Sequence, residues 1–126
     1  MTPWWRWIKL RTEMNQASYI YRCTLHRVID GDTIEVMVDL GFKRYSREKV
    51  RIAGIDAPER NTQWGPAATD FTKHWCEDAE LLLESHKSDS FGRWLGAIYK
   101  TNAFGGEIRS LAADLLDSGN AIPYRA

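Results

Sequence analysis

The chain has 126 residues, which suits one domain with a single hydrophobic core, and 44% of them are hydrophobic. The 17 basic and 17 acidic residues balance, which argues against tight non-specific binding to nucleic-acid duplexes. No apolar run reaches membrane-spanning length, so we expect no stable membrane insertion. Arg6, Lys9 and Arg11 interrupt any signal-peptide core, and a cytoplasmic location is the default expectation, with secretion not excluded.

Residues 1–18 form a tryptophan-rich extension ahead of the domain, which we place at 19–126. A short helix beginning near Pro3 would put Trp4 and Trp7 on one face. A cationic face of this kind suits a membrane surface or stacking on nucleic-acid bases. The simpler interpretation, which we favour, is that the tryptophans cover an apolar patch on the domain.

The first half of the domain has the pattern of an antiparallel meander. Strand-forming residues run over 19–29, 33–38 and 46–55. Asp30-Gly31 is typical of a hairpin turn between the first two runs, and 39–42 predicts the next turn.

The second half alternates helical and strand patterns. Apolar residues at helical spacing predict a helix over 67–79 and a second one over 108–116. The runs 81–83 and 93–99 are strand-like, and Gly119 suits the C-terminal cap of the last helix. The order β-β-β-α-β-β-α predicts an α+β, mainly β fold: a small five-stranded barrel with helices packed on it.

The cysteines and histidines show no catalytic or metal-binding spacing. Cys23 and Cys76 fall in different predicted elements, and we expect two buried free thiols rather than a disulfide. His26, His74 and His86 form no constellation, so we interpret them as structural or surface residues. A catalytic mechanism that depends on histidine is therefore not expected.

Acidic and basic residues gather at two strand ends. Asp30-Gly31-Asp32-Thr33 and Asp56-Ala57-Pro58-Glu59 each follow an apolar run, and carboxylates suit a hard cation that prefers oxygen ligands. Arg51 and Arg93 add guanidinium groups that suit phosphate. Each residue also has a structural interpretation, because the acids could form turns and the arginines could be their ion-pair partners.

Five pieces in order carry a resemblance: Val28–Thr33, Arg51–Glu59, Gly65–Ala68, Asp89–Arg93 and Leu115–Gly119. Together they resemble the staphylococcal nuclease-like (thermonuclease) domain family over roughly residues 19–124. The resemblance implies an OB-fold barrel of five strands with two or three helices. It also implies a calcium-dependent nuclease that cleaves DNA, RNA or both and leaves 3′-phosphate ends.

The same resemblance implies a site for one Ca²⁺ ion. Asp32 and Asp56 match the family's metal-binding carboxylates, and Ala57 matches the residue that gives a backbone carbonyl. The family often has threonine at the Ala57 position, but a carbonyl ligand does not depend on the side chain. Thr33 is interpreted as a hydrogen-bond donor supporting the ligands.

The implied catalytic residues are Glu59, Arg51 and Arg93. Glu59 matches the glutamate that contacts the attacking water, as a general base or as an orienting group. The two arginines match the phosphate-binding arginines. Tyr124 matches loosely a nucleotide-stacking tyrosine, and Phe91 stands where some members have tyrosine.

Five basic residues lie between positions 43 and 51. Lys43 and Lys49 are candidate substrate contacts, although a solvated hairpin edge would have the same composition. We expect a monomer that prefers single-stranded DNA or RNA. The alternative is a non-catalytic binding module on the same fold, and the complete set of acids and arginines argues for the enzyme.

Overall fold

The computed structural model describes residues 19–88, 92–101 and 107–124. The predicted extension over 1–18 and the Phe91 position lie outside these residues. None of the helices in the described part of the chain is long and apolar enough to cross a bilayer.

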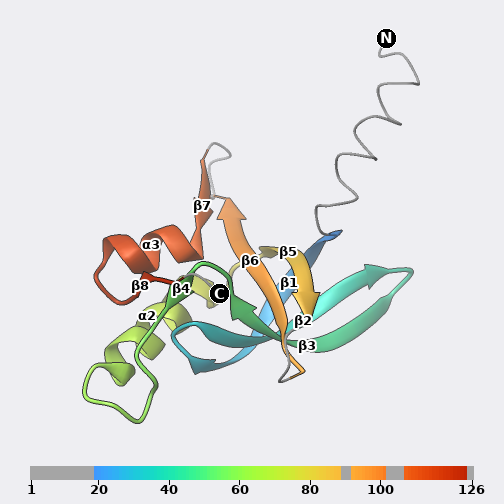
Figure 1. The fold of residues 1–126 in the computed structure, drawn as a ribbon. Coiled ribbons are helices and arrows are strands. Elements are labelled where there is room, and N and C mark those ends of the chain that lie inside the picture. Colours follow the sequence, from blue (N-terminus) through green and yellow to red (C-terminus); the bar gives the residue numbers. More distant parts are fainter. Residues whose placement is uncertain (1–18, 89–91, 102–106, 125–126) are drawn as a thin grey trace.

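Five strands close into a mixed barrel (Figure 1). They are β1 (Tyr19–Asp30), β2 (Thr33–Gly41), β3 (Arg44–Ile52), β5 (Leu81–Ser88) and β6 (Trp94–Thr101). Their order is β3-β2-β1-β5-β6 with antiparallel neighbours, and a parallel pairing of β3 with β6 closes the barrel. The predicted meander and the predicted five-stranded barrel are confirmed.

Three short strands were not predicted. Strand β4 (Ile55–Asp56) pairs with β8 (Ile122–Pro123), and β7 (Ile108–Ser110) extends the sheet beside β6. The prediction of one strand over 46–55 was wrong, because β3 ends at Ile52 and Gly54 turns the chain with a φ of +83°. This break lets Asp56 pair with the C-terminal segment instead of continuing along the barrel.

Two helices cover one side of the barrel, opposite the tip of the β2–β3 hairpin (Figure 1). Helix α2 (Gly65–Cys76) has proline in its first turn, and helix α3 (Leu111–Asp117) is capped by the Ser110 hydroxyl, which accepts from Ala113 N at 3.3 Å. The predicted second helix began too early, because Ile108 lies in β7. Gly119, at a φ of +77°, takes the predicted cap position.

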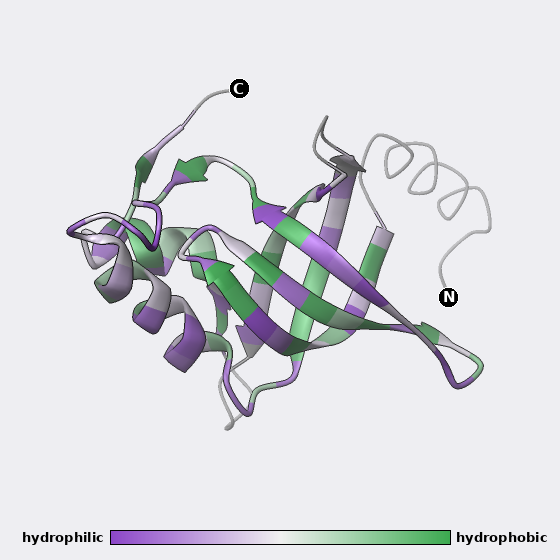
Figure 2. Cartoon of the chain, turned by 90° about the horizontal axis from the view of Figure 1, so that it is seen from below, coloured by the Kyte–Doolittle hydropathy of each residue, from purple (hydrophilic) through white to green (hydrophobic). Residues whose placement is uncertain are grey.

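Alternating side chains fill the barrel, so hydrophilic and hydrophobic residues alternate along its strands (Figure 2). The largest fully buried apolar side chains are Ile34, Val36, Val50, Ile52, Ile55, Leu81, Ile98, Leu111 and Leu115. Cys23 and Cys76 are buried free thiols, as predicted.

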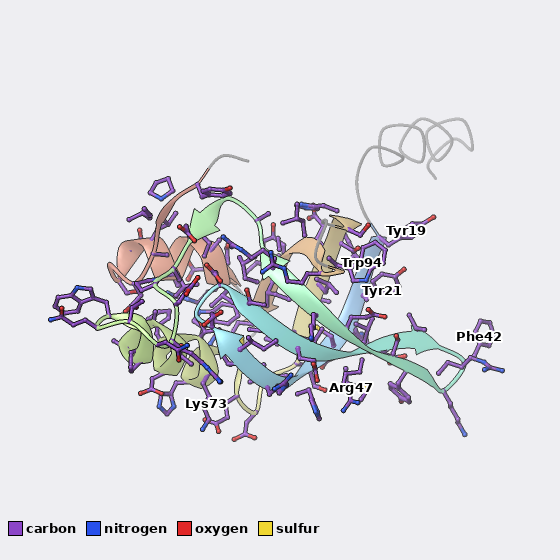
Figure 3. All side chains as sticks on the ribbon, turned by 60° about the horizontal axis from the view of Figure 1, so that its bottom comes forward. Tyr19, Tyr21, Phe42, Arg47, Lys73 and Trp94 are labelled. Atoms are coloured by element: carbon purple, nitrogen blue, oxygen red, sulfur yellow. The ribbon has the colours of Figure 1, made fainter. Side chains whose placement is uncertain are left out.

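The β2–β3 hairpin projects from the barrel with Phe42 at its tip (Figure 3). Gly41 pairs with Arg44, so Phe42 and Lys43 form a two-residue turn with φ values of +55° and +60°. The predicted turn over 39–42 was therefore placed too early. Positive φ at two bulky residues is costly, because the Cβ atom crowds the backbone.

Candidate active site

The turn between β1 and β2 is pressed against α2. A Cβ atom at Gly31 would lie 2.9 Å from Ala68 Cβ and 3.1 Å from Ala57 Cβ, so only glycine allows this approach. The Thr72 hydroxyl donates a 2.6 Å hydrogen bond to the Gly31 carbonyl from inside the protein. Helix α2 therefore fixes the position of the acidic turn.

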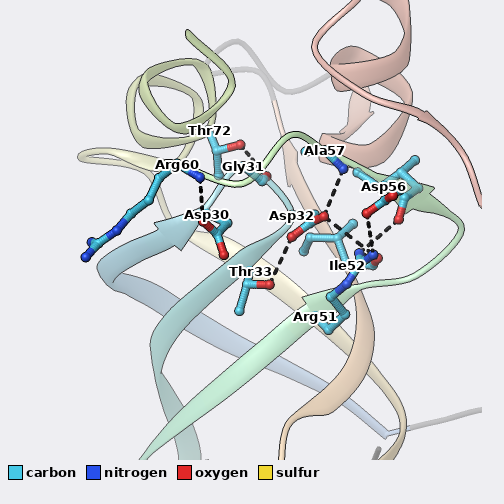
Figure 4. Close-up of polar contacts among 11 residues, drawn as sticks. Asp30, Gly31, Asp32, Thr33, Arg51, Ile52, Asp56, Ala57, Arg60 and Thr72 are labelled. Atoms are coloured by element: carbon cyan, nitrogen blue, oxygen red, sulfur yellow. Dashed lines mark hydrogen bonds and ion pairs between the residues drawn. The ribbon is translucent and has the colours of Figure 1, made fainter. Parts of the chain in front are cut away.

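Asp32 is the buried carboxylate of this turn, with 6% of its surface exposed. Its Oδ1 accepts from the Thr33 hydroxyl at 3.0 Å, and its Oδ2 accepts from the Ala57 backbone N–H at 2.8 Å (Figure 4). The Thr33 hydroxyl is thus a hydrogen-bond donor to the Asp32 carboxylate. The bond to Ala57 ties the turn directly to the segment that follows β4.

Asp30 does more than form the turn for which it was predicted. Its Oδ1 accepts from the Arg60 backbone N–H at 2.9 Å (Figure 4). Asp30 and Asp32 therefore hold the segment 57–60 at two points. The order of the two acidic motifs in the sequence was a signal for this contact, but only the fold shows which atoms meet.

Arg51 lies between the two acids predicted to bind metal. Its Nη1 donates to the carbonyls of Ile52 and Ile55 at 2.8 and 2.9 Å. Its Nη2 lies 3.4 Å from Asp32 Oδ2 and 3.3 Å from Asp56 Oδ1. Because one nitrogen contacts both carboxylates, Asp32 and Asp56 face the same small space (Figure 4).

A pocket opens beside Asp56, whose side chain is 51% exposed. Its volume is about 250 Å³, and it is lined by Asp56, Ala57, Pro58, Gly119, Asn120, Ala121 and Ile122. Pairing of β4 with β8 forms this pocket, because it brings the C-terminal segment against the acidic motif.

Tyr124 extends the same segment toward Arg51. Its backbone N–H donates to the Gly54 carbonyl at 3.0 Å, and Arg51 Cζ lies 5.8 Å from the centroid of its ring. This is within range of a cation–π contact. The half-exposed ring leaves a flat apolar surface next to a guanidinium group.

The remaining predicted site residues are Glu59, Arg93, Lys49 and Lys43. Glu59 is exposed, and in the described ranges no contact joins its side chain to Asp32 or Asp56. Its carbonyl accepts from the Thr62 hydroxyl at 2.6 Å, and a side chain at Gly65 would overlap that carbonyl. The backbone of Glu59 is therefore well fixed, whereas the residue as a whole is exposed to solvent.

Arg93 immediately precedes β6, whose Leu95 is the parallel partner of Arg51. Arg93 is two positions before Leu95, so strand alternation continued by one residue would put Arg93 on the face of Arg51. Lys49 lies on this face as well, two positions before Arg51. Lys43 does not join them, because it stands at the hairpin tip, at the opposite end of β2 from Asp32.

The donors near Asp32 and Asp56 are oxygen atoms. Among the described residues, no three or more histidine, cysteine or acidic side chains come together as a metal site. Protein carboxylates would thus give few ligands, with carbonyl groups and water completing the shell. That donor set fits a hard cation such as Ca²⁺ better than zinc.

A sequence profile described as "Staphylococcal nuclease homologue" matches residues 49–126. The chain belongs to this family. A "Micrococcal nuclease" from Shigella flexneri is 31% identical over 108 residues, covering 83% of this chain and 59% of the relative. An "Uncharacterized endonuclease" from Escherichia coli O157:H7 is 37% identical over 73 residues, 58% of this chain and 44% of the relative. "Protein ParB" from Escherichia coli is 31% identical over 102 residues, 79% of this chain and 55% of the relative.

This chain therefore spans between 44% and 59% of the length of these relatives. The Micrococcal nuclease match reaches beyond the profile match, which begins at residue 49 within β3.

Proposed function

We propose that this chain is a calcium-dependent nuclease that hydrolyses phosphodiester bonds of DNA, RNA or both and leaves 3′-phosphate ends. The observation that carries the proposal is the position of Arg51 Nη2, within 3.4 Å of Asp32 and 3.3 Å of Asp56. A cationic fork and two carboxylates then share one space, which is what a phosphate and its counter-ion require. The names of the family and of two relatives support the same reaction class.

Asp32, Asp56 and the Ala57 carbonyl would hold the ion. Asp32 Oδ1 accepts one described hydrogen bond, from Thr33, and a carboxylate oxygen can accept two. Asp56 is half exposed, so water can complete the coordination shell. When bound, Ca²⁺ would polarise a phosphoryl oxygen and offset the negative charge of the phosphodiester.

Arg51 would bind the phosphate as charge increases in the transition state. Two backbone carbonyls already hold its Nη1, at 2.8 and 2.9 Å, so the guanidinium is oriented before substrate arrives. Arg93 shares its face of the barrel and would supply the second guanidinium. Glu59 would contact the attacking water, and Tyr124 would stack on a base beside Arg51.

The direct test is cleavage of labelled single-stranded DNA and RNA with Ca²⁺, with and without a chelator. Arg51→Lys keeps the charge but loses the planar fork, and we expect activity to fall by about 10²–10³. Glu59→Gln should also lose most activity, and the exposed distant Arg22→Ala serves as the control. Full activity of Arg51→Lys, with a wild-type melting temperature, would contradict the assigned role.

The second candidate is a nucleic-acid-binding module without catalysis. It is favoured by the exposed Glu59 carboxylate and by the ion pairs that Arg51 makes with both acids. This alternative predicts oligonucleotide binding that persists in chelator, together with no cleavage of any nucleic acid by the wild type. Chelator-sensitive cleavage would exclude it.

A further inference from the structure

One face of β3 carries basic and aromatic side chains from the hairpin to the active site. Alternate positions along the strand share a face, and on this face they are Tyr45, Arg47, Lys49 and Arg51. The other face carries the buried Val50 and Ile52. The pattern is visible in the sequence, but the register of β3 is needed to assign the basic residues to the outside of the barrel.

A buried carboxylate anchors two arginines on this outer face. Glu35 is 8% exposed, and its Oε2 lies 3.5 Å from Arg27 Nη2 while its Oε1 lies 3.6 Å from Arg47 Nε. His26 Nε2 lies 3.6 Å from the same Oε1. Strand register places Lys49 directly beside Glu35, and Figure 3 shows Arg47 projecting outside the β2–β3 ladder.

The charges of this group do not cancel. Arg27, Arg47 and Lys49 contribute three positive charges against the single negative charge of Glu35. The side chains of both arginines are 58% exposed, so each guanidinium keeps donors available to solvent. An arginine already held by a carboxylate loses less freedom when it binds phosphate. One arginine would neutralise Glu35, and a purely structural ion pair would not need the others.

The group is continuous with the proposed active site, because Lys49 stands two residues from Arg51 on the same face. The distance along β3 from Tyr45 to Arg51 is six residue steps, about 20 Å at roughly 3.3 Å per residue. A stacked strand with about 3.4 Å per phosphate would place roughly six nucleotides along this length.

A hollow beside Tyr45, across the outer faces of β1, β2 and β3, limits the path. It is lined by Arg22, Cys23, Thr24, Met37, Asp39, Tyr45, Asp78, Ala79 and Glu80. Three of these residues are acidic, and Arg22 is paired with Glu80 at 3.5 Å. Negative charge there would repel phosphates and keep a bound strand on the basic side of the face.

We propose that Arg27, Arg47 and Lys49, called here the outer basic strip, bind the backbone phosphates of a single nucleic-acid strand that leaves the site at Arg51. The strip would hold the strand roughly two to four nucleotides from the reacting phosphate, because Lys49 and Arg47 stand two and four positions from Arg51. That the bound strand is a substrate rests on the proposed nuclease function, whereas its binding does not.

The test measures binding of a fluorescent 12-nucleotide single strand by anisotropy, in chelator, over a series of salt concentrations. The test variant combines Arg27→Ala, Arg47→Ala and Lys49→Ala. A matched control combines Arg22→Ala, Arg44→Ala and Lys73→Ala, which removes the same charge from three exposed positions off the strip. Arg44 is informative because alternation puts it on the opposite face of β3 from Lys49.

We expect the strip variant to bind at least about tenfold more weakly at low salt, and the control to bind like the wild type. The dependence of log K on log salt should become shallower by about 2, at roughly 0.7 per lost contact with a single strand. Circular dichroism should show a folded protein at the assay temperature, whereas the melting temperature should fall, because the buried Glu35 carboxylate loses Arg27 and Arg47.

Equal weakening by the two triple variants would overturn the proposal, because it would show only a bulk charge effect. Unchanged binding of the oligonucleotide by the strip variant would overturn the proposal too. This holds even if the strip variant no longer binds a poly-glutamate peptide, because the strip would then bind an acidic peptide and not a nucleic acid. Substrate length separates this proposal from the catalytic one. If the wild type cleaves, the strip variant should lose kcat/KM on the 12-mer but not on a trinucleotide. If the wild type cleaves nothing, a strip-specific loss of binding still supports the strip and contradicts the nuclease.

Discussion

Replacing Thr72 by valine would test how α2 holds the acidic turn. The Thr72 side chain is fully buried, and its hydroxyl donates to the Gly31 carbonyl at 2.6 Å. Valine has nearly the same shape but no donor, so a buried carbonyl would lose its partner. The penalty for such a group is about 1–3 kcal/mol. A loss of about 2 kcal/mol raises the unfolding equilibrium constant by roughly 30-fold.

Urea unfolding followed by tryptophan fluorescence measures this loss. With a slope of about 2 kcal/mol per molar urea, the midpoint should fall by roughly 1 M without a change in slope. Thr72→Ser is the matched control, because it keeps the hydroxyl and removes one methyl group, costing about 1 kcal/mol. A valine variant as stable as the wild type, or a serine variant that is less stable than valine, would refute the reasoning.

Three further predictions concern stability and reactivity. Burial alone would raise the pKa of Asp114, but hydrogen bonds from Arg109 and Trp75 outweigh it and lower the pKa, so this stabilisation is present above about pH 4 and is lost as pH falls through the lowered value. In thermal melts, the difference in melting temperature between the wild type and Asp114→Asn should therefore become smaller below pH 4. A difference that does not change with pH would contradict this. The double substitution Phe42→Asn with Lys43→Gly should relieve strain in the positive-φ turn and raise the free energy of unfolding, measured in urea, by about 1 kcal/mol. A less stable double variant would show that the turn is not strained. Burial raises the pKa of Cys23 and Cys76 to about 12, so both thiols should react with a thiol reagent at pH 8 only in denaturant, and rapid labelling of the native protein would refute this.

The barrel was predictable because its strands alternate strictly and its turns carry clear signals. Val36 and Val38 face inward while Glu35 and Met37 do not, which is a period of two that needs no tertiary information. The break after β3 was not predictable in this way. Nothing in the apolar run around Gly54 shows that the chain turns there to pair with Ile122, far away in sequence.

The site was predicted as a set of residues, and its geometry depends on long-range contacts. The resemblance pointed to Asp32, Asp56 and Arg51, and the fold brings these three together. Gly31 was assigned to a turn, although its lack of a side chain is needed for contact with α2. The anchoring of Arg27 by Glu35 depends on the register between β1 and β2, which includes a bulge that no local pattern reveals.

Cleavage of a single-stranded oligonucleotide by the wild type and by Asp56→Asn, with Ca²⁺ or with chelator, tests the central claim most directly. Asp56 is half exposed, so the variant should remain folded while the shared space loses one carboxylate charge. The proposed function predicts cleavage by the wild type with Ca²⁺, none with chelator, and a loss of about 10²-fold or more in the variant. Cleavage that is unaffected by chelator, or a fully active Asp56→Asn variant, would contradict it.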